Sequence, residues 1–95
     1  MIYQVWRVEP AGWARAIQAE RVEFPGLEQF EFFVHKSGLD WRVSEKTTGC
    51  AIPRADHRDR ATCINAAARE LKDQGAEKLA QIIDQVLADR KAARP

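Results

Sequence analysis

The sequence has few of the features that mark a catalytic or metal-binding protein. Its five glycines are isolated, so neither a phosphate-binding loop nor a dinucleotide-binding fingerprint is present. It contains no closely spaced pair of cysteines or histidines of the kind that structural zinc sites use. A serine elbow motif and paired carboxylates are missing as well. These absences predict a protein that is not an enzyme and that uses no cofactor and no metal.

Long apolar runs are also missing. No segment reaches the roughly 18 apolar residues of a transmembrane helix. Arg7, Glu9 and Arg15 interrupt the N-terminal segment, which therefore lacks the apolar stretch of a signal peptide. The sequence predicts a cytoplasmic protein without membrane contact. In that reducing compartment we expect Cys50 and Cys63 to be free thiols that pack as small apolar residues.

The chain has no large excess of either charge. Its 15 basic and 14 acidic side chains give a net charge of +1, too even to indicate a polyanionic partner from total charge alone. The distribution is less even: residues 1–35 carry three basic and five acidic side chains, whereas residues 36–60 carry six basic and four acidic ones. The only cationic concentration therefore lies in the middle of the chain, and nucleic-acid binding remains a candidate function.

The length of 95 residues predicts a single domain spanning residues 1–95. Hydrophobic residues at 45% and charged residues at 31% are typical of a globular protein. A domain of this size can bury one modest core, but it has little room for an enclosed substrate pocket.

Residues 1–53 are predicted to be mostly β structure. Residues 2–8 have the composition of a strand, while residues 13–24 fit either a helix or a strand, with 19–24 favoured as extended. Residues 29–36, 41–46 and 50–52 predict an antiparallel meander. Alternation along it predicts a core face made of Phe30, Phe32, Val34, Trp41, Val43, Cys50 and Ile52. The outward face then holds Gln29, Glu31, Phe33, His35, Arg42, Ser44 and Lys46.

Residues 59–91 are predicted to be helical. Asp59 is the expected N-cap, with Thr62 as the alternative, and Gly75 is expected to end a first helix. A second helix follows from about Ala76 to Arg90, and residues 92–95 form a frayed tail. The predicted fold class is therefore α+β: an antiparallel meander of three to five strands with two C-terminal helices packed on one face.

The leading functional hypothesis is a small accessory or regulatory protein that acts through contacts with a protein partner or with a second copy of itself. Tryptophan and apolar helix stripes are frequent at such contacts. The residues predicted to make them are Trp13, Leu79, Ile82, Ile83, Val86 and Leu87. The alternative for the helical stripe is packing within the chain's own core.

The second hypothesis is a nucleic-acid-binding module. Aromatic and basic side chains on a sheet face can stack on bases and neutralise phosphates, and a basic loop before a helix can add phosphate contacts. The residues predicted for this role are Phe33, His35, Arg42 and Lys46 on the sheet, with Arg54, Arg58 and Arg60 from the loop. The alternative is a solvated face of mixed charge, because Glu31, Asp40 and Glu45 lie among the same positions.

Overall fold

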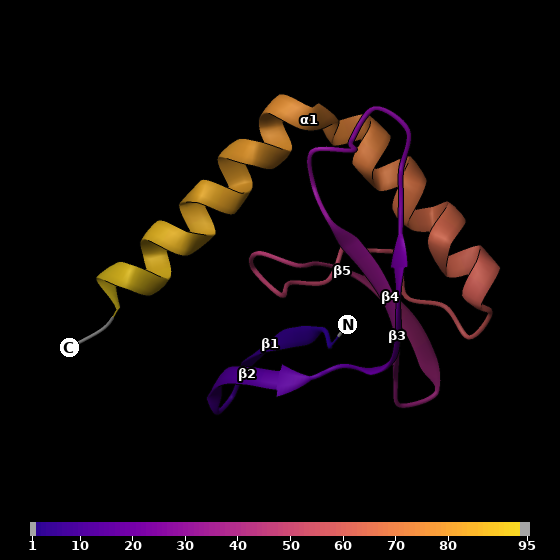
Figure 1. The fold of residues 1–95 in the computed structure, drawn as a ribbon, viewed down its shortest axis with the longest axis horizontal. Helices are drawn as coiled ribbons and strands as arrows, with labels where there is room; N and C mark the ends of the chain where they lie inside the picture. Colours follow the sequence, from indigo (N-terminus) through magenta and orange to yellow (C-terminus); the bar gives the residue numbers. More distant parts are fainter. Residues whose placement is uncertain (1, 94–95) are drawn as a thin grey trace.

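The computed structural model describes residues 2–93 and shows two small antiparallel sheets and one long helix (Figure 1). The α+β class is therefore confirmed. The first sheet is a hairpin, and the second has the strand order β3-β4-β5. The elements are β1 (Gln4–Val8), β2 (Ala11–Arg15), β3 (Ile17–Val22), β4 (Phe32–Ser37), β5 (Asp40–Glu45) and α1 (Arg60–Ala92).

The prediction of a single meander is wrong. The expected third strand at residues 50–52 is reduced to one isolated bridge between Ser44 and Ala51. The free edge of β4 pairs instead with β3, so the segment 13–24 contains the end of β2 and the whole of β3, and its helical alternative is wrong. A tight turn after β5 explains the short third segment, because the Glu45 carboxylate accepts hydrogen bonds from the backbone N–H groups of Thr47 and Thr48 at 2.6 and 2.8 Å.

The core lies between the three-stranded sheet and the first segment of α1. The small residues Cys63 and Ala67 let the helix approach β5 closely, and the Cys63 thiol donates a hydrogen bond to the Trp41 carbonyl at 3.2 Å. Burial raises the pKa of the Cys63 thiol, which therefore stays protonated. The buried members of the core are Phe24, Leu27, Phe32, Val34, Val43, Ile52, Ala55, Cys63, Ala67, Leu71 and Leu79.

The opposite face of the sheet is covered as well. The alternation predicted for β4 is correct, since Phe32 and Val34 enter the core, but the other side is not open to solvent. The ring of Tyr3 stacks on Phe33 with 4.4 Å between the ring centroids, and Phe33 is fully buried. The Trp6 backbone N–H donates to the Gly49 carbonyl at 2.9 Å, which fixes the hairpin β1–β2 against the turn after β5.

The C-terminal half holds one helix, so the prediction of two separate helices is wrong. Asp59 caps its start as predicted, accepting hydrogen bonds from the backbone N–H and the hydroxyl of Thr62, both at 2.8 Å. At Gly75 the backbone leaves the helical conformation (φ 80°, ψ 163°) and returns to it at the next residue. One glycine therefore bends α1 without a connecting loop (Figure 1). Residues 76–92, called the arm below, lead away from the sheet.

The frayed tail predicted at residues 92–95 is described only in part. Ala92 is the last residue of α1 and Ala93 caps it, while residues 94–95 lie outside the described residues. Between residues 2 and 93, no helix combines the length and the apolar character that crossing a membrane requires.

Candidate functional site: a cationic hollow

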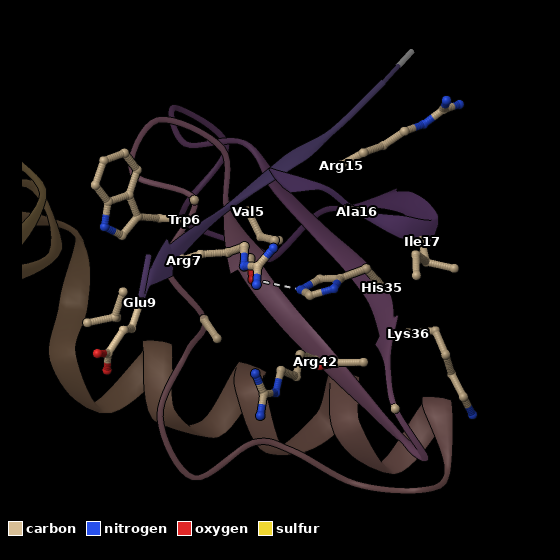
Figure 2. A pocket seen from close by; sticks show the side chains of 16 residues that line it. Val5, Trp6, Arg7, Glu9, Arg15, Ala16, Ile17, His35, Lys36 and Arg42 are labelled. Carbon is tan, nitrogen blue, oxygen red and sulfur yellow. Dashed lines mark hydrogen bonds between the residues drawn. The ribbon is translucent and has the colours of Figure 1, made fainter. Parts of the chain in front are cut away.

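A hollow of about 490 Å³ opens between the hairpin β1–β2 and the outer side of β4 and β5 (Figure 2). Its charged lining consists of four cations and one carboxylate, which are Arg7, Arg15, Lys36, Arg42 and Glu9. We call this feature the cationic hollow. Since the whole chain carries a net charge of only +1, the hollow concentrates positive charge that the total composition hides.

Four strands of the two sheets supply these cations. Arg7 comes from β1, Arg15 ends β2, Lys36 is near the end of β4, and Arg42 lies on β5 opposite His35. In Figure 2, Arg7 and Arg42 occupy the middle of the view, whereas Arg15 and Lys36 extend at its edge. The positive charges are therefore spread around the opening and do not converge on one point.

The cations differ in how they are neutralised. Arg42 Nε lies 2.8 Å from an Asp56 carboxylate oxygen, in an ion pair that is well exposed to solvent. Arg7, Arg15 and Lys36 form no ion pair with any residue between 2 and 93. Lys36 Nζ instead lies 4.9 Å from the centre of the Trp41 ring. Three cations of the hollow are thus available to an anionic ligand.

The buried part of the hollow is neutral. His35 Nε2 and Ser44 Oγ are 2.8 Å apart, and the two residues are only 5% and 1% exposed. Burial lowers the pKa of His35, and the nearby charge of Arg42 lowers it further, against the opposing effect of a hydrogen bond with the backbone of Lys36. The imidazole is therefore uncharged at neutral pH. The separation would suit a nucleophile and its base, but the burial of Ser44 keeps its hydroxyl away from an incoming substrate.

Only two of the residues predicted for nucleic-acid binding line the hollow, namely His35 and Arg42. The prediction of an exposed aromatic face is wrong, because Phe33 is fully buried beneath Tyr3 and His35 is almost fully buried. Lys46 borders a different hollow and lies 3.7 Å from a Glu31 carboxylate oxygen.

The basic loop is largely neutralised by ion pairs. Arg54 makes two hydrogen bonds to the Glu70 carboxylate at 2.9 and 2.8 Å, and Arg60 lies 2.6 Å from a Glu20 carboxylate oxygen. Arg58 is exposed and has no ion pair within residues 2–93. The predicted group of seven residues therefore does not form one surface.

Sequence reasoning missed Arg7, Arg15 and Lys36 as site residues. Arg7 and Arg15 lie in an N-terminal third whose overall charge is negative, so the count by thirds conceals them. The available signal was the turn at residues 10–12, which joins two segments that each carry an arginine. That signal predicts a hairpin, but it does not predict which face of the second sheet the hairpin covers.

The residues predicted for partner contacts are partly used inside the chain. Leu79 is buried, and Ile83 and Val86 are half-buried. Trp13, Ile82 and Leu87 remain 46%, 38% and 37% exposed. Another hollow, largely apolar and of about 270 Å³, lies between the arm and the segment 48–53.

No three side chains of His, Cys, Asp or Glu gather closely enough to hold a metal ion in the part of the chain that the structure describes. Cys50 and Cys63 are both free, as expected from the sequence. Comparison with protein families, with curated proteins and with solved structures finds no match to this chain.

Proposed function

We propose that the protein is a non-enzymatic binding module that holds the phosphate backbone of a nucleic acid at the cationic hollow. The observation that carries the proposal is the group Arg7, Arg15 and Lys36, which lack ion pairs in the described chain and line one hollow. Guanidinium groups bind phosphate oxygens through paired hydrogen bonds, and lysine adds a point charge. A polyanion relieves the mutual repulsion of these cations.

The spread of the cations favours an extended ligand over a single small anion. They come from four strands in two sheets and surround a neutral, buried floor of His35 and Ser44. Contacts made to phosphates alone carry no sequence information. We therefore expect binding that tolerates different base sequences and weakens steeply with added salt.

The test is fluorescence anisotropy with labelled single-stranded and double-stranded oligonucleotides, measured between about 50 and 200 mM salt. The test variant combines Arg7→Ala, Arg15→Ala and Lys36→Ala. Its matched control combines Arg21→Ala, Lys46→Ala and Arg54→Ala, which removes three cations that each have a carboxylate partner away from the hollow. Both variants lose the same charge.

The slope of log K against log salt is negative, and loss of three phosphate contacts reduces its magnitude by about two to three. The control variant should keep the wild-type slope. Equal losses in the two variants would show that only the net charge matters, and an absence of binding at low salt would refute the proposal.

A second proposal is favoured by exposed apolar side chains. Contacts with a protein partner through Trp13 and the arm would cover Trp13, Ile82 and Leu87, which are the predicted contact residues that remain exposed. Sedimentation of the wild-type protein and of an Ile82→Ser, Leu87→Ser variant tests self-association. A wild-type dimer that weakens in the variant supports the proposal. If the two proteins sediment alike at every concentration, a second copy is not the partner of these residues.

A further inference from the structure

The bend in α1 depends on a single residue. Gly75 has φ 80° and ψ 163°, a conformation that is essentially restricted to glycine. A Cβ atom placed there would meet no atom within 4 Å outside the neighbouring helix backbone, so there is space for an alanine and only the backbone conformation opposes it. With Gly75 in the helical region, α1 would continue as one straight helix.

The arm contacts the body both close to the bend and near its far end. Leu79 is buried, and the arm faces the segment 48–53 across the apolar hollow. Near the end of the arm, Arg90 Nη2 donates to the Cys50 sulfur at 3.2 Å. The Arg90 guanidinium also lies 3.9 Å from the centre of the Trp6 ring. We call the segment 48–53 together with Trp6 the docking site.

A straight α1 cannot use the docking site of its own chain. Its 33 residues would span about 50 Å, whereas the longest dimension of the bent molecule is 41 Å. The arm would then project into solvent with its apolar side chains uncovered, and the docking site would be empty. The segment whose shape and charge match that empty site is the arm of another copy.

We propose that a second copy of this chain is the partner of the arm. Two copies straighten at Gly75 and exchange residues 76–92, so that each arm occupies the docking site of the other. Every contact of Leu79 and Arg90 is reproduced between copies, and the exchange closes as a two-fold dimer.

This inference names the partner for the second proposed function and is independent of nucleic-acid binding. It is tested with Gly75→Ala, because alanine strongly disfavours the bent conformation and favours a continuous helix. The matched control is Gly38→Ala, at a glycine with φ 62° whose Cβ would also meet nothing within 4 Å. It introduces similar backbone strain in the turn between β4 and β5, outside α1.

Sedimentation equilibrium should show the wild type in a monomer–dimer equilibrium. Gly75→Ala should lower the dimer dissociation constant by about 30-fold or more, because alanine disfavours the bent form and favours the straight one. Gly38→Ala should keep the wild-type constant. Monomeric wild type and monomeric Gly75→Ala with native helicity would overturn the inference.

Cross-linking shows which chain receives the arm. An Arg90→Cys substitution places a thiol near Cys50, and Cys63 is fully buried, so a bifunctional maleimide joins positions 50 and 90. In the dimer we expect links between chains, seen as covalent dimers on a denaturing gel. Links only within chains of a proven dimer would overturn arm exchange and leave the protein-contact proposal standing. If Gly75→Ala fails to fold, the same measurement on Arg90→Cys alone, at rising concentration, decides between the two outcomes.

Discussion

Gly49 lies against the backbone of the hairpin β1–β2, and its replacement by alanine tests that contact. A Cβ atom at Gly49 would lie 2.5 Å from Cζ3 of Trp13, 2.7 Å from the backbone nitrogen of Trp6 and 3.1 Å from the carbonyl carbon of Val5. The Trp6 nitrogen belongs to the backbone and donates to the Gly49 carbonyl, so it cannot move without breaking that hydrogen bond. Gly49→Ala must therefore displace the hairpin.

The expected loss of stability has two parts. The positive φ of 69° at Gly49 costs an alanine about 1–2 kcal/mol. Overpacking against the hairpin adds about 1–3 kcal/mol. The sum of about 2–5 kcal/mol is a large part of the roughly 5–14 kcal/mol expected for a domain of this size.

The matched control is Gly38→Ala. Gly38 has φ 62°, but a Cβ atom there would meet nothing within 4 Å, so only the backbone cost applies. Urea unfolding followed by tryptophan fluorescence and circular dichroism measures both variants. We expect Gly49→Ala to be less stable than Gly38→Ala by about 1–3 kcal/mol. Equal losses would mean that the hairpin is not packed on Gly49, and the wall of the cationic hollow would be misplaced.

Three further predictions concern the buried histidine, the core and the helix cap. Because burial lowers the pKa of His35, the unfolded chain binds more protons, so stability falls as the pH drops below about 6.5, by at most about 1.4 kcal/mol per pH unit. Urea midpoints across this range should show that slope in the wild type and a flatter one in His35→Gln. Leu71→Ala should lose about 2–5 kcal/mol in urea unfolding, whereas Leu39→Ala at a 70% exposed position should lose little. Asp59→Ala should lower the thermal midpoint relative to the wild type, whereas Asp73→Ala should leave it nearly unchanged, because Asp59 is the residue that caps the start of α1. Equal shifts in the two variants would contradict the cap.

The features that sequence predicts well here are local. The alternation along β4 identifies Phe32 and Val34 as core residues, and Asp59 is recognisable as a cap from its position before a helical pattern. Gly75 is recognisable as a helix breaker because it is a glycine within a helical pattern. The sequence does not show whether it causes a bend or a loop, because both have the same signal. In the structure the helix resumes at Ala76.

The features that sequence does not predict depend on contacts between distant segments. Phe33 and His35 read as outward-facing, and only the packing of Tyr3 and the hairpin against them makes that face buried. The cationic hollow arises from the same packing, because it brings Arg7 and Arg15 next to strands that they do not pair with. No local pattern contains this arrangement.

The most direct test of the central claim is the salt dependence of oligonucleotide binding by the wild type and by the Arg7→Ala, Arg15→Ala, Lys36→Ala variant. The account predicts that the wild type binds at low salt. It also predicts that the slope of log K against log salt is less steep in the variant, by about two to three. It also predicts that the Arg21→Ala, Lys46→Ala, Arg54→Ala control keeps the wild-type slope. A wild type that binds no oligonucleotide, or a hollow variant that matches its control, would contradict it.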